Sequence, residues 1–428
     1  MVVYRAPWSL SLREQQSLDF FLAETKTRFP AEFCRPILKA ANTEAVLAHA
    51  VISFGALHQA YEYRPDGATR VDYTPLGQFA TYQYGKALRL LRAQSRRPRG
   101  LETLMPREDI TLACCVLFAC FESIRGCRRS TIIHITRGLN LLRQYKTLPQ
   151  STQGALVPKQ VLTSLLTRLD NQLVELLGTK VSVTINDKNY DKQVTSALET
   201  MEEICAREDS YCSLDGLLNN ILHDRLNTAL AIEGRVVPNL PSDQGRVSRY
   251  LKELQSNFTS ASTPKHPTPG EGDSYDHDPG IMQIWCILGN IYVSLPLTMF
   301  PEHVWDQYMA DFGSIVSLAE NYINRSRSPG RSSRRQTFSF SLGIIPPLYV
   351  VASRCRDRDI RRRAITLLKN CKRREILWDS NMATEAAIQV IMIEENGAST
   401  GESCARIHNV NAILDDEDGV SFEFERSI

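Results

Sequence analysis

Glycine is scarce in this sequence, and the motifs that hold phosphate groups or a catalytic nucleophile are missing from it. Only 22 of the 428 residues are glycine, below the usual share of about 7%. The patterns GxGxxG, GxxxxGK[ST], GxSxG and HExxH do not occur. Because phosphate cradles need glycines where the backbone approaches the ligand, this argues against the common nucleotide enzymes. We therefore predict no enzyme activity, no catalytic residue and no cofactor-binding residue.

Paired cysteines are also lacking. The eleven cysteines include no CxxC pair, and residues 1–12 show no signal peptide, so we interpret them as reduced intracellular thiols. One cluster exists, at Cys114, Cys115, Cys120 and Cys127, and three of its members sit in an apolar run where cysteine packs as a small hydrophobe. Arg125 and Arg128 flank the fourth and favour a lower thiol pKa, but a reactive cysteine also needs a base and exposure. We predict no metal ligands.

Histidines are few and scattered. Only eight occur, and His49 and His58 stand nine residues apart on a predicted helix. That spacing does not bring both rings to one metal-facing turn. Hydrogen-bonded helix histidines are the preferred interpretation.

Excess charge of one sign is absent overall, with a formal net charge of +2. This excludes a strongly basic chain wrapped along nucleic acid, and 43% apolar residues exclude a largely disordered one. The most basic stretch, Arg354–Arg374, holds ten basic and two acidic residues. It fits nucleic-acid binding or a nuclear import signal. The alternative, preferred because aromatic platforms are lacking, is an amphipathic helix with its arginines in solvent and these apolar residues inward: Ile360, Ala364, Leu367 and Leu368.

Long apolar runs are interrupted. Asp278 and Glu302 enclose 23 uncharged residues, and Arg335 and Arg354 enclose 18. A membrane span needs about 20 predominantly apolar residues. The first run contains Pro296 and the second contains a proline pair, so we predict buried core helices and no membrane partner.

What the sequence does contain is helical periodicity. Ser11 and Glu14 form a capping box, Asn42 is a candidate cap for a second helix, and a third is expected from Leu76 to Ser95. On the third, the inward residues are predicted to be Phe79, Tyr82, Leu88 and Leu91. The run 110–121 is apolar on every face, which predicts a helix enclosed by others. Further helices are expected at 130–145 and 159–177.

The predicted fold class is therefore all-α, a large multi-helix domain with a small C-terminal β-hairpin. We expect helices of one domain at 10–255, 281–323 and 337–400, a disordered loop at 256–280 and an Arg/Ser-rich loop at 324–336. The hairpin is expected at 401–428, because apolar residues alternate there on both sides of Asp418-Gly419. The neighbouring acidic run 415–418 also fits an acidic activation tail.

Four segments together resemble the regulatory (middle homology) domain of fungal zinc-cluster transcription factors. They cover roughly residues 10–428 in the expected order, and no single motif decides the match. The segments are Leu18–Phe21 with His49–His58; Tyr82–Leu88; Leu117–Gly126 with His134–Ile135 and Gly138–Leu142; and Pro346–Tyr349 through Cys355–Asp357 and Ile360–Ala364 to Arg374–Glu375 and Leu377–Asp379.

The resemblance implies an all-helical regulatory domain, a nuclear location and control of transcription, often of a metabolic gene cluster. Members of that family begin with a six-cysteine zinc cluster that contacts DNA, and this sequence has no such array. Either the gene model is truncated, or a DNA-binding transcription factor or transcription complex is the partner and DNA is met only indirectly. A homo- or hetero-dimer is compatible with either. The alternative function is an enzyme or accessory protein of a biosynthetic cluster with an unrecognised site.

Overall fold

The structure is a computed structural model of the whole chain. It describes residues 9–29, 31–64, 70–95, 108–147, 155–177, 214, 217–219, 221–223, 225, 244–261, 278–296, 302–326, 336–340, 343–399, 407–414 and 420–426. The chain divides into two compact units. The first comprises residues 1–170, 272–276 and 334–341, and the second comprises 171–271, 277–333 and 342–428.

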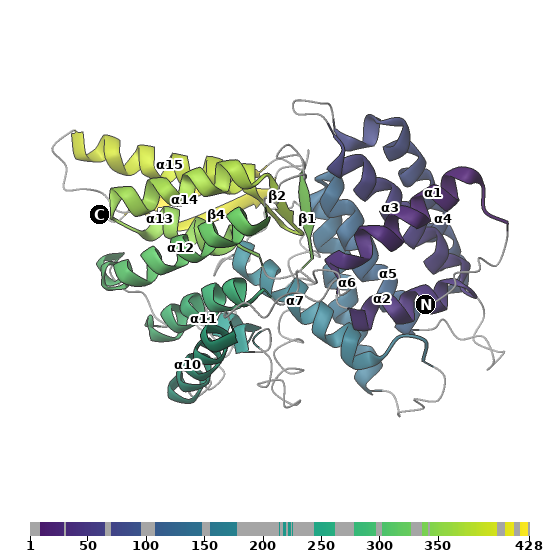
Figure 1. Cartoon of the computed structure of the whole chain (residues 1–428), viewed down its shortest axis with the longest axis horizontal. Helices are drawn as coiled ribbons and strands as arrows, with labels where there is room; N and C mark the ends of the chain where they lie inside the picture. The colour runs from purple at the N-terminus through teal and green to yellow at the C-terminus, as the bar shows by residue number, and fades with distance from the viewer. Residues whose placement is uncertain are drawn as a thin grey trace. The chain divides into compact units, whose positions relative to one another are not determined.

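The first unit is a helical bundle (Figure 1). Its α-helices are joined by two short 3-10 helices, Thr25–Arg28 and Val71–Tyr73. They are α1 (Leu12–Ala23), α2 (Ala31–Ala41), α3 (Ala45–Glu62), α4 (Pro75–Ser95), α5 (Glu108–Arg125), α6 (Arg128–Thr147) and the first part of α7 (Lys159–Leu177). The predicted capping box is confirmed, because Ser11 and Glu14 bond each other's backbone N–H groups at the start of α1.

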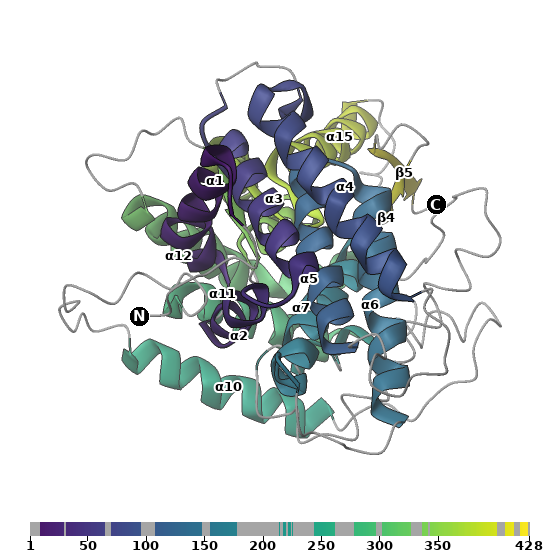
Figure 2. The same ribbon diagram turned by 90° about the vertical axis from the view of Figure 1, so that its right-hand side faces the viewer.

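Helix α3 lies inside this bundle. It packs against α1, α2, α4 and α5, and almost all of its residues are buried (Figure 2). Gly55 permits the close approach of α1, because a Cβ there would collide with the carbonyl oxygen of Ser17. The predicted cap is wrong by two residues: Glu44 is the N-cap, and its side chain makes no capping bond.

Helix α5 has no polar face and is enclosed, as the sequence predicts. Residues 112–121 are all buried, with α3 and α6 packed against the helix. Leu117 is 1% exposed. Because an apolar helix gains most from burial on every side, this segment forms the interior of the first unit.

A short strand distant in sequence completes the same core. Strand β1 (Thr337–Ser339) packs against α3. Phe338 meets Phe54 with ring centroids 5.6 Å apart, and Phe340 meets Phe29 at 5.1 Å. These aromatic pairs tie residues near 340 to the N-terminal helices.

The second unit begins with the end of α7 and also carries mostly helices. They are α10 (Gln244–Ala261), α11 (Pro279–Ser294), the 3-10 helix Glu302–Tyr308, α12 (Met309–Ser326), α13 (Ile345–Arg354), α14 (Arg358–Cys371) and α15 (Ser380–Ser399). Helix α11 packs between α10 and α12, and α14 contacts α12, α13 and α15, so these helices lie side by side in Figure 1.

Two antiparallel strand pairs complete the second unit. Short strands β2 (Arg373–Glu375) and β3 (Trp378–Asp379) pair between α14 and α15. Strands β4 (Ile407–Leu414) and β5 (Val420–Arg426) form the C-terminal hairpin, with Val410 opposite Phe424. The predicted fold class, all-α with a C-terminal hairpin, is thereby confirmed. The turn residues 415–419 lie outside the described residues.

Several predicted boundaries need correction. The predicted loop at 256–280 is shorter than expected, because α10 continues to Ala261 and α11 begins at Pro279; residues 262–277 lie outside the described part. Ser256 and Thr259 lie within α10, and their hydroxyls donate to carbonyls one turn back. Asp278 caps α11 in front of a proline at its first position.

Two other predicted segments also differ. Helix α12 runs to Ser326, inside the segment 324–336 that was assigned to a loop, and 327–335 lie outside the described residues. The segment 337–400, expected to hold helices only, contains β1, β2 and β3. Strands of two or three residues leave too short a pattern for periodicity to mark. The region 10–255 spans the division between units, which falls inside the continuous helix α7.

The inward face of α4 is displaced from its prediction. Ala80, Gln83, Tyr84 and Ala87 are buried, whereas Tyr82 is 58% exposed. Polar Gln83 turns inward because it bonds His49 and Glu14. Of the described helices, none is both long and apolar enough to cross a membrane.

Candidate functional site

The basic stretch Arg354–Arg374 is the sequence's main candidate for a binding site, and it forms α14 with its two flanks. Asp357 caps the helix by accepting the N–H groups of Asp359 and Ile360 at 3.0 and 2.9 Å. Ala364 and Leu368 are fully buried, which confirms the amphipathic interpretation.

Two arginines of this stretch do not face solvent, against the prediction. Arg361 is 7% exposed and donates to Glu394 and to the carbonyl oxygen of Ala352, each at 2.7 Å. Arg373 is also 7% exposed, and donates to Glu375 and to the Tyr322 hydroxyl. A buried charge costs several kcal/mol unless it is paired, which is why each guanidinium lies against a carboxylate.

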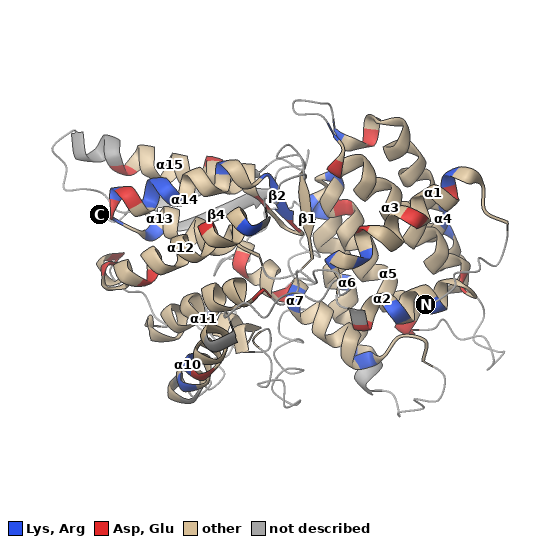
Figure 3. Cartoon of the chain, viewed as in Figure 1, with Lys and Arg blue, Asp and Glu red and all other residues tan. Residues whose placement is uncertain are grey.

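Most of the remaining arginines of this stretch are neutralised as well; Figure 3 marks the basic and acidic positions along the ribbon. Arg354 pairs with Glu302 at 3.0 Å, Arg363 with Glu320 at 2.6 Å and Arg374 with Asp379 at 2.7 Å, while Arg356 shares Glu394 with Arg361. These carboxylates come from four different elements. The segment therefore connects the helices of the second unit through ion pairs. Most of its positive charge is neutralised by carboxylates of the same fold.

The sequence could not have revealed these pairs. Glu394, Glu320 and Glu302 lie 33, 43 and 52 residues from their arginine partners. Helical periodicity identifies partners three or four residues apart, so it carries no signal for them. Counting only the Lys and Arg residues of a stretch therefore overestimates the positive charge that is available to bind a ligand.

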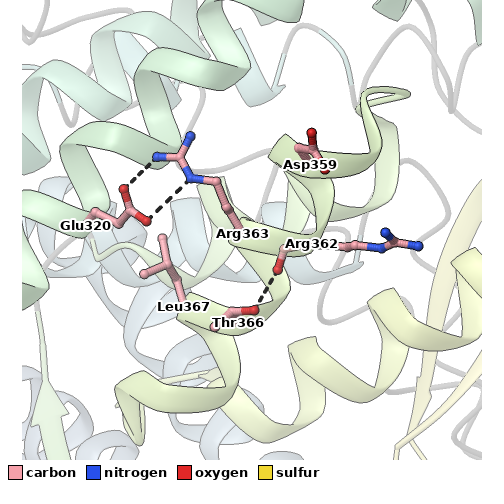
Figure 4. Close-up of a pocket in the computed structure, with 6 residues that line it drawn as sticks. All are labelled: Glu320, Asp359, Arg362, Arg363, Thr366 and Leu367. Atoms are coloured by element: carbon pink, nitrogen blue, oxygen red, sulfur yellow. Dashed lines mark hydrogen bonds and ion pairs between the residues drawn. The ribbon is translucent and has the colours of Figure 1, made fainter.

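An open hollow of about 390 Å³ lies between α12 and α14. Figure 4 shows the Arg363 guanidinium crossing to the Glu320 carboxylate, while the Arg362 side chain points away and Thr366 bonds back to the Arg362 carbonyl. Asp359 and Leu367 complete its lining. Because the hollow carries both signs of charge and its central ion pair is already satisfied, it shows no preference for an anion or a cation.

The two histidines of α3 both lie in buried hydrogen-bonded clusters. His49 Nδ1 lies 2.7 Å from the Gln83 amide oxygen. His58 Nδ1 lies 2.9 Å from the Thr25 hydroxyl, and its Nε2 lies 3.2 Å from Glu62 Oε1. Burial lowers the pKa of both imidazoles. Each is held as a hydrogen-bonded helix histidine, which is the preferred interpretation from the sequence.

Glu62 joins the second of these clusters to an arginine. It accepts from Arg28 at 3.0 Å, and both side chains are buried. Burial alone raises the pKa of Glu62, but the His58 hydrogen bond and the nearby charge of Arg28 bring it to about 2. With the imidazole neutral, Arg28 and Glu62 balance one another inside the first unit.

The four clustered cysteines are buried. Burial raises the pKa of the Cys115 thiol to about 12 and that of Cys114 and Cys120 well above its usual range. Arg70, not Arg125, donates to the Cys127 sulfur, at 3.5 Å. In the part of the chain that the structure describes, no three His, Cys, Asp or Glu side chains gather as metal ligands.

Comparison with known proteins gives this helical architecture a context. Residues 19–169 match the fungal specific transcription factor domain. Over 92% of this chain and 75% of the other, the sequence is 23% identical to the aspercryptin biosynthesis cluster-specific transcription regulator atnN of Emericella nidulans. No solved structure matches the chain. The match at 19–169 runs from the second half of α1 into α7 and covers α2 to α6 completely. The predicted resemblance is therefore confirmed: residues 19–169 match the fungal specific transcription factor domain, and the chain is similar over most of its length to a transcription regulator.

Proposed function

We propose that this chain regulates transcription in the nucleus together with a DNA-binding partner, and that it controls a metabolic or secondary-metabolite gene cluster. The observation that carries the proposal is the extent of the match to a cluster-specific regulator. That match reaches across 92% of the chain, well beyond the domain at 19–169. Similarity over both units favours a shared mode of action over a shared helical domain alone.

A partner is proposed because the group that contacts DNA in the resembled family is not found among these 428 residues. The six-cysteine zinc cluster implied by the resemblance has no counterpart in the sequence, which contains no CxxC pair. The described cysteines are buried, except Cys371, which is half-buried. In the proposed complex the partner supplies the base contacts, which specify the site. This chain supplies the regulatory surface.

Tethering tests the regulatory role directly. The full chain is fused to a heterologous DNA-binding domain and brought to a reporter promoter in a fungal host. We expect reporter expression to change several-fold relative to the DNA-binding domain alone. A fusion that accumulates in the nucleus but leaves the reporter unchanged contradicts the proposal.

Promoter binding tests the need for a partner. The purified chain is titrated against a promoter duplex from its own gene cluster and against a shuffled duplex of equal length, at physiological salt. We expect no preference between the two unless a zinc-cluster partner is added. Nanomolar, sequence-selective binding by the chain alone would show that it reads bases itself.

A further inference from the structure

Charge in the first unit is segregated along the sequence. Residues 73–101 contain six Lys or Arg, and residues 123–169 contain eight; neither segment contains Asp or Glu. Helix α4 lies in the first segment and α6 in the second. Over the whole chain the basic and acidic residues nearly cancel, so this imbalance is local.

Packing brings the two helices together. The Tyr84 hydroxyl on α4 lies 2.9 Å from His134 Nε2 on α6. Both rings also meet Phe118 of α5, with centroids 5.0 and 5.4 Å away. Helices α4 and α6 thus flank the same residue of α5, and Figure 2 shows them next to one another. The surface formed by these two helices is here named the α4–α6 face.

The outer side of α4 carries Lys86, Arg89 and Arg92, on the side opposite its buried residues. Arg89 and Arg92 are exposed, and the Lys86 ammonium stands 4.7 Å from the ring centroid of the exposed Tyr82. On α6, Arg137 is exposed. Burial and the charge of Arg137 lower the pKa of His134 to about 4, which places Arg137 beside the contact between the two helices.

Carboxylates near this face are already engaged. Glu14 is buried and accepts hydrogen bonds from Ser11 and Gln83. Glu122 and Asp72 both pair with Arg125, at 2.9 and 3.0 Å. In the stretch Arg354–Arg374, six basic side chains pair with carboxylates.

The chemistry of the face fits phosphate better than an acidic peptide. Its cations are mostly arginine, whose guanidinium matches a phosphate with two parallel hydrogen bonds. A peptide helix would need an apolar groove for its anchors. Among the described residues of α4 and α6, the exposed large apolar side chains are only Tyr82 and Leu90.

We propose that the α4–α6 face binds the phosphate backbone of double-stranded DNA, without base preference. This deepens the proposed function and rests on it in one respect, that a transcription regulator works at DNA. Phosphate contacts fix position and orientation on a duplex and carry no sequence information. The face would therefore hold the chain against the DNA beside the site that the partner reads.

Salt dependence is the test. The full chain is titrated with a fluorescent duplex of random sequence between low and physiological salt. We expect log Kd to rise linearly with log salt. Replacing Lys86, Arg89 and Arg92 together by Gln should lower that slope by about 2 to 3, at about 0.9 per lost phosphate contact. Glutamine is chosen because it preserves the helix.

The matched control removes the same charge from exposed positions on α14, through Arg358→Gln, Arg362→Gln and Lys369→Gln. Its slope should stay at the wild-type value. The proposal is overturned if both triple variants lower the slope equally. It is also overturned if the wild-type chain shows no salt-dependent binding to the duplex. So does poly-glutamate that binds the α4 face while the duplex does not. The tethered reporter does not depend on this face. If the tethered fusion changes reporter expression but the chain does not bind the duplex, only this inference is contradicted and the proposed function stands.

Discussion

Glu375 occupies the space beside Gly343, where any Cβ would collide with its carboxylate. From there its two oxygens accept the N–H groups of Ile344 and Ile345 at 3.0 and 3.1 Å. The next two residues of α13 are prolines and have no N–H, and Leu348 already donates to Ile344. A carboxylate from β2 therefore satisfies the remaining donors at the start of a helix 30 residues earlier.

Gly343→Ala tests this arrangement. The added methyl group must displace Glu375, which then loses its bonds to α13 and to Arg373. We expect the free energy of unfolding to fall by about 2 kcal/mol or more, since overpacking and a disturbed buried ion pair act together. Chemical denaturation measures the change. The control is Gly313→Ala on α12, where a Cβ meets Ile360 at an ordinary 3.6 Å and a helical alanine is favoured. Equal effects at both glycines would contradict the role of Glu375.

Leu117→Asp should prevent folding of the first unit. Leu117 is 1% exposed on α5, so the substitution places an unpaired carboxylate in an apolar interior at a cost of several kcal/mol. We expect loss of the cooperative melt and of solubility. Leu12→Asp is the matched control, because Leu12 is 76% exposed in the first turn of α1, where an acidic residue suits the helix dipole. A soluble, cooperatively melting Leu117→Asp protein would refute the central position of α5.

Glu62→Gln should produce a pH-dependent loss of stability. The pKa of Glu62 is lowered to about 2 in the folded chain, below the value near 4.3 expected when unfolded. Its charged form therefore stabilises the fold above pH ~4.3, and that contribution is lost as the pH falls toward 2. The stability difference between wild type and Glu62→Gln should be largest near neutral pH and shrink through this window.

Urea titrations at several pH values measure that difference. Glu32→Gln, at an exposed position of α2, serves as the control and should leave stability at neutral pH nearly unchanged. A difference for Glu62→Gln that stays constant from neutral pH to pH ~2 would show that Arg28 and Glu62 do not form a stabilising pair.

Sequence reasoning succeeded where the signal is local. The Ser11–Glu14 box, the apolar run of α5 and the alternation in β4 and β5 each specify their structure within a few residues. It failed where a distant residue decides. Gln83 points inward on α4 because its amide donates a hydrogen bond to Glu14. The two residues are 69 positions apart, so helical periodicity cannot predict this pair.

The same limit applies to charge. Counting cations drew attention to the stretch that forms α14, whose carboxylate partners are remote in sequence. The carboxylate-free segments 73–101 and 123–169 carry a plainer signal, the absence of one sign of charge over a long run. The absence of Asp and Glu can be seen in the sequence alone. That α4 and α6 lie next to one another is known only from the structure.

Glu394 is the residue through which the hairpin is joined to α14 and α15. It is 2% exposed and lies on α15, where it accepts from Arg361 at 2.7 Å and from the N–H of Ile407 at 3.3 Å. Arg356 pairs with the same carboxylate, and together these charges hold the pKa of Glu394 below its usual range against the opposing effect of burial. Removing it strands two arginines and frees the first residue of β4.

Glu394→Ala should therefore destabilise the second unit by about 3 kcal/mol, as expected when one partner of a buried ion pair is lost. Hydrogen exchange should show strand β4 losing protection before α13, because the bond to Ile407 disappears while the Glu375 cap remains. Glu385→Ala, at an exposed position of the same helix, should change neither quantity. If β4 keeps its protection in the Glu394 variant, the hairpin is anchored by other contacts, and this carboxylate serves only to neutralise the arginines of α14 and its flank.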